Sequence, residues 1–140
     1  GYPEPEDERN MVLRRQGGNP LALIRPVVTR EQLAAMQDEA AAVYMKAELI
    51  DYAVSLIGAT RAHPLILRGA SPRATLSVTA MAKSVAYVQG RDYVVPKDVQ
   101  TVFVSTVAHR LLMSPEAEAK AITPETVLEE ILKRTPAPRV

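Results

Sequence analysis

The stretch Arg-Gly-Ala-Ser-Pro-Arg-Ala at residues 68–74 holds the side chains best suited to chemistry on an anion. Ser71 and Pro72 predict the start of a helix, with Ser71 as the N-cap and Pro72 in the first turn. Arg73 then falls where the positive end of the helix dipole makes a cation unfavourable by roughly 0.3–1 kcal/mol. Because Arg68 lies just upstream, two guanidinium groups and free backbone N–H groups could converge on a phosphate. The alternative is that Arg73 simply points into solvent.

Other catalytic patterns are absent from the sequence. Neither of the glycine-rich phosphate-binding patterns occurs, and no Gly-x-Ser-x-Gly turn presents a serine nucleophile. His63 and His109 lack the spacing and the cysteine neighbours of a metal site, so we expect no metal to be bound. The sequence therefore does not assemble a complete active site.

Two further polar segments favour structural roles. Gly90 predicts the end of a helix, and Arg91 and Asp92 are expected to pair locally in the turn that follows. His109 and Arg110 suit the negative end of a helix dipole, although they could also face a partner.

The elements that would position these residues are mostly helices. Hydrophobic residues make up 47% of the 140 residues and charged residues 24%, which is typical of a globular chain. Twenty alanines and only six aromatic residues favour close helix packing. Capping signals and 3.6-residue periodicity predict an all-α bundle of about six helices, at residues 3–16, 29–42, 46–62, 71–89, 97–110 and 123–134.

The segments between these helices are predicted to be irregular or briefly extended. Residues 17–28, which begin with a stop at Gly17, should be an extended linker, and residues 43–45 and 94–95 short extended pieces. The loop at 62–70 should tuck Leu65, Ile66 and Leu67 into the core, and 111–122 should be loosely structured. In the 71–89 helix, the side chains predicted to face inward are Val78, Met81, Ala82, Val85 and Val88.

Charge and composition narrow the classes of function. The formal net charge is +1, from 17 basic and 16 acidic residues, so a broad basic face for nucleic acid is not indicated and nucleic acid is not the expected partner. With no cysteine, the chain has no disulfide, and a cytoplasmic location is expected. The longest apolar run covers residues 40–45, far short of the roughly 20 residues that a membrane span needs.

Five short motifs, taken in order, resemble the C-terminal lid of MoxR-type AAA+ ATPases. They are Gly-Tyr-Pro at 1–3, Thr-Arg-Ala-His-Pro at 60–64, Gly-Ala-Ser-Pro-Arg-Ala at 69–74, Gly-Arg-Asp-Tyr-Val-x-Pro-x-Asp-Val at 90–99 and His-Arg at 109–110. The resemblance covers nearly the whole chain and implies an AAA+ lid fold. It also implies a division into residues 1–28, a helix and linker from an ATPase core that precedes Gly1, and residues 29–140, the helical lid.

The resemblance further implies a function for the longer protein. There, ATP would lie between an α/β domain and the lid, and a neighbouring subunit of a homo-oligomeric ring would complete the pocket. Arg73 matches the sensor-2 arginine, a catalytic residue that reaches the terminal phosphate and binds the nucleotide. Ser71 within the motif, and Arg68 and Arg61, which no motif assigns, are the other residues expected to help bind the nucleotide. ATP and Mg²⁺ would serve the longer protein, a chaperone-like remodeller of an unknown protein substrate, and this chain alone would bind and hydrolyse no ATP. The alternative is a stand-alone helical module that binds proteins or nucleic acid.

Overall fold

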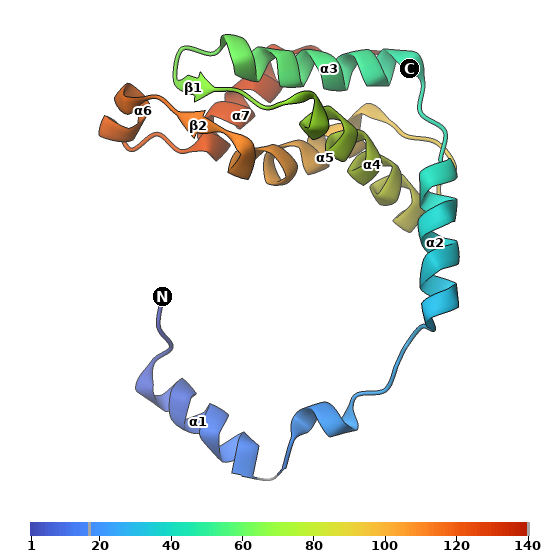
Figure 1. Ribbon diagram of the computed structural model, residues 1–140, viewed down its shortest axis with the longest axis vertical. Helices are drawn as coiled ribbons and strands as arrows, with labels where there is room; N and C mark the ends of the chain where they lie inside the picture. The colour runs from blue at the N-terminus through green and yellow to red at the C-terminus, as the bar shows by residue number, and fades with distance from the viewer. Residues whose placement is uncertain (17, 140) are drawn as a thin grey trace. The chain divides into compact units, whose positions relative to one another are not determined.

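The computed structural model describes residues 1–16 and 18–139, and these form two compact units, Gly1–Ala34 and Ala35–Val140 (Figure 1). The predicted division between residues 28 and 29 falls inside the first unit. Gly17, predicted as part of the stop after the first helix, lies outside the described residues, as does Val140 at the chain end.

The first unit contains α1 (Pro5–Gln16) and a 3₁₀ helix, η1 (Pro20–Leu23). Acidic residues occupy the first turn of α1 and Arg14 and Arg15 its last turn, which is the charge order that a helix dipole favours. The helix therefore lies where the sequence predicts it. The predicted linker is not extended throughout, because the Asn19 side chain accepts the Leu21 N–H at 3.2 Å and starts η1.

Helix α2 (Arg30–Ala42) begins with a capping box, in the range predicted for a helix. The Thr29 hydroxyl oxygen accepts the Gln32 N–H at 3.1 Å, and the Gln32 side-chain oxygen accepts the Thr29 N–H at 2.7 Å. None of its residues is buried, in contrast to the helices that follow.

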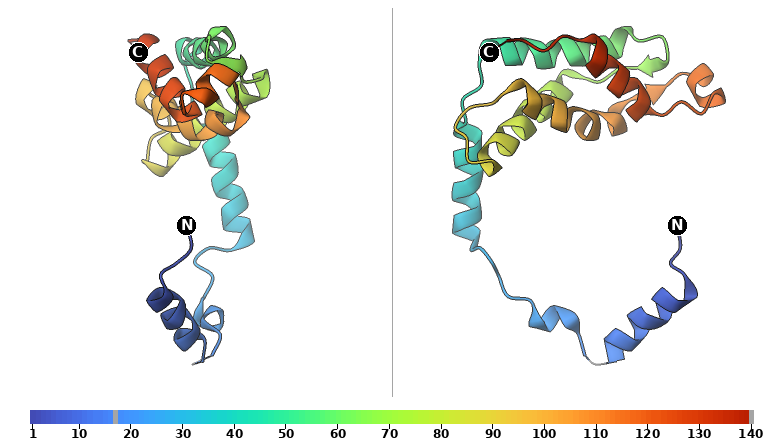
Figure 2. Two further views of the ribbon diagram at one scale, coloured as in Figure 1. Left: turned by 90° about the vertical axis from the view of Figure 1, so that its left-hand side faces the viewer. Right: turned by 180° about the vertical axis from the view of Figure 1, so that it is seen from behind.

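The second unit is a helical bundle with one small β-sheet, as the two views of Figure 2 show from the side and from behind. Its further elements are α3 (Ala47–Ala62), β1 (Ile66–Arg68), α4 (Pro72–Val88), α5 (Pro96–Val107), η2 (Ala108–Arg110), β2 (Leu112–Met113), α6 (Pro115–Ala119) and α7 (Pro124–Arg134). Helices α3, α4, α5 and α7 pack around a core that is mostly aliphatic and contains two aromatic rings, Tyr52 and Phe103. The all-α prediction is thus confirmed, with seven α-helices in the described residues where about six were expected.

The inward face of α4 differs from the prediction. Its fully buried stripe is Ala74, Val78, Ala82 and Ala86, four residues at i, i+4 spacing. Met81 and Val88 were predicted to face inward, but they are 47% and 83% exposed. Small side chains, rather than the larger apolar ones, therefore form the contact of α4 with its neighbours, which lets the helices approach closely.

Strand β1 replaces the predicted loop, and β2 and α6 replace the loosely structured stretch. The two strands pair antiparallel, with Ile66 opposite Met113 and Arg68 opposite Leu112. Ile66 is buried, but Leu67 is 65% exposed, so only part of the predicted apolar segment enters the core. Strands of two and three residues are too short to show the alternation that would predict them.

The turn after α4 contains an ion pair that differs from the predicted one. Gly90 has a φ of +74°, the left-handed conformation expected at a helix end. Arg91 pairs with Asp98 of α5 rather than with Asp92, through two hydrogen bonds of 2.8 and 2.7 Å. This hydrogen bonding raises the pKa of Arg91. Asp98 is almost fully buried and also accepts the Val95 N–H at 2.8 Å, so one carboxylate holds the turn and starts α5.

Candidate functional site

The start of α4 presents Arg73 in the first turn of the helix. Ser71 is the N-cap with extended backbone, Pro72 is the first helical residue, and Arg73 is the second. The Ser71 side chain accepts no hydrogen bond from this turn, whereas Ser114 and Thr123 do cap α6 and α7. Ser71 thus occupies the predicted position with a hydroxyl group that the helix does not use.

The Arg73 guanidinium is exposed and unneutralised. Within the described residues it forms no salt bridge and no side-chain hydrogen bond, and only its backbone carbonyl is engaged, by the Ser77 hydroxyl. The first turn of α4 contains no acidic residue. A cation at this end of a helix is unfavourable unless an anion is close, so the arrangement suits an external anionic ligand.

Two residues of α3 hold the loop that leads into α4. The buried Thr60 hydroxyl donates to the Ile57 carbonyl at 2.6 Å and accepts the Ala70 N–H at 3.0 Å. The Arg61 Nε donates to the Ala70 carbonyl at 2.8 Å. Both backbone groups of Ala70 are therefore fixed to α3, which sets the position of the α4 start two residues later.

The four residues predicted to form the site lie in or next to this loop. Arg61 holds the loop, Arg68 ends β1 with an exposed side chain, and Ser71 and Arg73 begin α4. No hydrogen bond joins the side chains of any two of them in the described part of the chain. Their roles toward a nucleotide stay predictions.

Gly69 allows the loop to pass close to α3. A Cβ added there would lie 2.7 Å from both the Cα and the backbone N of Arg61, which is closer than such atoms approach. Thr60 and Gly69 belong to two of the motifs in the sequence, but the motifs did not predict that Thr60 would hold the loop or that Gly69 would pass close to α3. The position of Thr60 could have indicated its role, because a polar residue on the buried stripe of a helix requires a hydrogen-bonding partner.

We expect Gly69→Ala to destabilise the chain by about 1–3 kcal/mol, because the new methyl group must displace the backbone of α3 or of the loop. Urea unfolding followed by circular dichroism measures this change. Gly58→Ala is the matched control, since a Cβ at Gly58 within α3 meets no atom within 4 Å. That variant should be stabilised by about 0.5–1 kcal/mol. Equal unfolding midpoints for the two variants would contradict the close approach.

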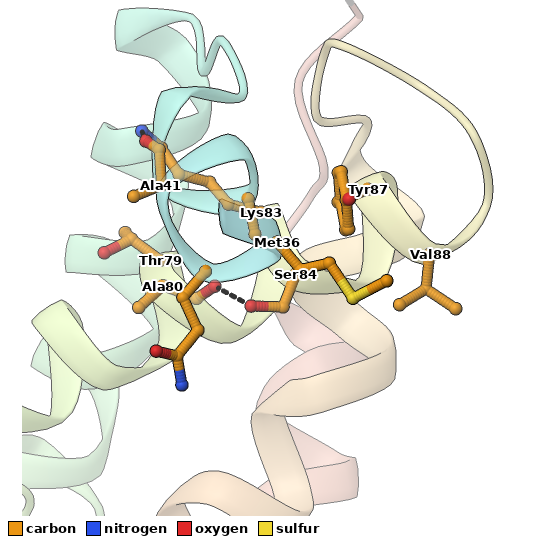
Figure 3. Close-up of a pocket in the computed structure, with 10 residues that line it drawn as sticks. Met36, Ala41, Thr79, Ala80, Lys83, Ser84, Tyr87 and Val88 are labelled. Atoms are coloured by element: carbon orange, nitrogen blue, oxygen red, sulfur yellow. Dashed lines mark hydrogen bonds between the residues drawn. The ribbon is translucent and has the colours of Figure 1, made fainter. Parts of the chain in front are cut away.

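A separate hollow lies between α2 and α4, lined by residues that include Met36, Ala41, Ala80 and Val88 (Figure 3). Lys83 donates to the Ala41 carbonyl at 2.9 Å, and nearby the Tyr87 hydroxyl donates to Glu39 at 2.6 Å. The second of these bonds raises the pKa of Tyr87. These two bonds connect α2 to α4, while the Thr79 and Ser84 hydroxyls donate to carbonyls within α4 itself.

The described residues contain neither a metal-binding cluster nor a membrane-spanning helix. No group of three or more histidine, cysteine, aspartate or glutamate side chains is placed to hold a metal ion. The His63 Nδ1 accepts the Leu65 N–H at 3.3 Å, which gives this histidine a structural role. No helix is both long and apolar enough to cross a bilayer.

The fold and its elements match a family of known domains. A family model described as "AAA lid domain" matches residues 58–131, which include the loop, α4, α5 and most of α7. The chain therefore belongs to the AAA lid domain family. Its relatives include proteins of the MoxR family over the whole length of the chain.

Three comparisons describe these relatives. The protein "Chaperone MoxR1" of Mycobacterium tuberculosis is 36% identical over 149 residues, covering 100% of this chain and 39% of that protein. The protein YeaC of Bacillus subtilis is 30% identical, covering 99% of this chain and 43% of that protein. The crystal structure of a candidate ATPase from Cytophaga hutchinsonii has a TM-score of 0.82 at 28% identity, over 99% of this chain and 45% of the other. The chain thus spans about two fifths of the length of these relatives.

Proposed function

We propose that this chain is the lid of a longer, ATP-hydrolysing AAA+ protein of the MoxR kind and that Arg73 is its sensor-2 residue. The observation that carries the proposal is the exposed, unpaired guanidinium of Arg73 in the first turn of α4. The motif around it resembles the sensor-2 element, and the chain belongs to the AAA lid domain family. Relatives about two and a half times as long leave room for a separate catalytic domain.

Arg73 would act on the terminal phosphate of ATP. A guanidinium group can donate two parallel hydrogen bonds to phosphate oxygens and stabilise the charge that develops as the phosphoryl group is transferred. Once that phosphate leaves, the contact is lost. The lid then has different contacts in the ATP and ADP states, and this difference in binding energy can drive a movement between domains.

The other predicted site residues would either contact the nucleotide or hold the loop before α4. The free hydroxyl of Ser71 and the exposed guanidinium of Arg68 are available to the nucleotide, while the Nε of Arg61 serves the loop. The phosphate-binding loop and the ligands for Mg²⁺ would come from the α/β domain, because this sequence contains neither. The longer protein would be a cytoplasmic ring of identical subunits that remodels a partner protein, in keeping with the name of the chaperone MoxR1.

Binding of fluorescent nucleotides to the longer protein tests the assignment of Arg73. We expect Arg73→Ala to weaken ATP binding about tenfold and to change ADP binding less than about twofold, because only ATP carries the terminal phosphate. Arg134→Ala is the control, since Arg134 is an exposed arginine on α7 that pairs with Glu130 of the same helix. Equal weakening of ATP and ADP binding would argue against a contact with the terminal phosphate.

A further inference from the structure

Arg110 is connected to the first turn of α4 by a chain of hydrogen bonds. Its Nη2 donates to the Ser77 hydroxyl oxygen at 3.2 Å, and the Ser77 hydroxyl donates in turn to the carbonyl of Arg73 at 3.1 Å. Its Nε donates to the Thr106 carbonyl at 3.1 Å, near the end of α5. One side chain thus links the end of α5 to the residue proposed to contact ATP.

The geometry of arginine suits this connection. Ser77 follows Arg73 by four residues, so the two side chains lie on the same face of α4, about one turn apart. The planar guanidinium donates from fixed directions, and here it addresses two acceptors on different helices at once. A lysine in its place has a single flexible ammonium group and would not hold both acceptors in the same relative position.

The charge of Arg110 also distinguishes it from a purely structural contact. Among the described residues it forms no salt bridge. Arg110 lies at the C-terminal end of α5 and η2, where the helix dipole favours a cation. Its bond to Ser77 places this second cation on the face of α4 that carries Arg73, where it adds to the positive charge that an anion would meet.

We propose that Arg110 is a positioning residue that acts through Ser77 to hold Arg73 in place for the terminal phosphate. This inference rests on the proposed function of Arg73. Arg110 itself is not assigned a contact with the nucleotide. Its role is to fix the first turn of α4 against the end of α5, so that the guanidinium of Arg73 is presented in one orientation when ATP binds.

Steady-state ATP hydrolysis by the longer protein tests this role through a double-mutant cycle. Arg110→Ala and Ser77→Ala should each lower kcat about three- to tenfold with a smaller change in KM, and the double variant should be no slower than the slower single one. Arg110→Ala in the Arg73→Ala background should have no further effect. Arg110→Lys should remain impaired, which separates the fixed donor geometry from the charge alone, and Arg134→Ala should match the unaltered protein.

The outcomes separate the two proposals. If Arg73→Ala leaves turnover unchanged, the proposed function fails. If Arg73→Ala is impaired but Arg110→Ala is not, or if their losses multiply in the double variant, only the inference about Arg110 fails. Thermal unfolding of each variant accompanies the kinetics. A loss of turnover in Arg110→Ala and Ser77→Ala that simply follows their melting temperatures, and that is equally large in the Arg73→Ala background, would also overturn the positioning role.

Discussion

Replacing Arg73 with alanine in the longer protein is expected to lower ATP turnover at least tenfold, which corresponds to about 1.4 kcal/mol of transition-state stabilisation. The reason is local: this guanidinium has no acidic partner in the described residues and lies in the first turn of a helix. Its charge would be used only when a phosphate is present. A coupled assay of phosphate release at saturating ATP measures the change.

Two comparisons make the result for Arg73 specific. Arg73→Lys should recover only part of the activity, because an ammonium group lacks the paired donors of a guanidinium. The fold should remain intact in both variants, since the side chain is exposed and contributes nothing to the core. Wild-type turnover in a correctly folded Arg73→Ala protein would remove this residue from the mechanism.

Asp98→Ala is expected to destabilise the chain by about 2–4 kcal/mol. Asp98 is 2% exposed and accepts two hydrogen bonds from Arg91 and one from the Val95 N–H. Truncating it removes the charged partner of Arg91, which keeps only the neutral acceptors Gln89 and Tyr93, and leaves the Val95 N–H at the start of α5 without its acceptor. The free energy of unfolding, obtained from urea titration, measures the loss.

Asp92→Ala provides the matched control for Asp98→Ala. Asp92 is adjacent to Arg91 in the sequence and was the predicted partner, but its carboxylate forms no salt bridge in the described residues. Its substitution should change stability by less than about 0.5 kcal/mol. If Asp92→Ala proved as damaging as Asp98→Ala, the assignment of the ion pair would be wrong.

Helices were the part of the fold that the sequence predicted best, because their signals are local. The box formed by Thr29 and Gln32 and the cap at Thr123 each depend on residues three positions apart, and helices begin at both places as predicted. The pairing of β1 with β2 could not be predicted, since it joins residues more than forty positions apart and involves only a few of them. The pairing of Arg91 with Asp98 instead of Asp92 also depends on residues apart in the sequence, because the turn after Gly90 brings Asp98 to the Arg91 guanidinium.

The sequence predicted where Arg73 lies in its helix, but it did not predict the contacts around the candidate site. The Ser-Pro pair placed Arg73 in the first turn of a helix, and the structure agrees. The sequence did not indicate that Thr60 and Arg61 fix Ala70 or that Arg110 reaches Ser77, because these contacts depend on how α3, α4 and α5 pack. Helix packing also decides which face of α4 is buried. The 3.6-residue periodicity did not show that the alanine stripe would face the core and leave Met81 and Val88 exposed.

That alanine stripe has a mechanical consequence. Ala74, Ala82 and Ala86 allow α4 to pack closely against its neighbours, and the Arg91–Asp98 ion pair joins the far end of α4 to α5. We therefore expect the two helices to behave as one rigid body. A helix of 17 residues is roughly 25 Å long. Beyond the other end of α4 from Arg73, a backbone bridge joins Tyr44 to Tyr93, and both tyrosine side chains are exposed.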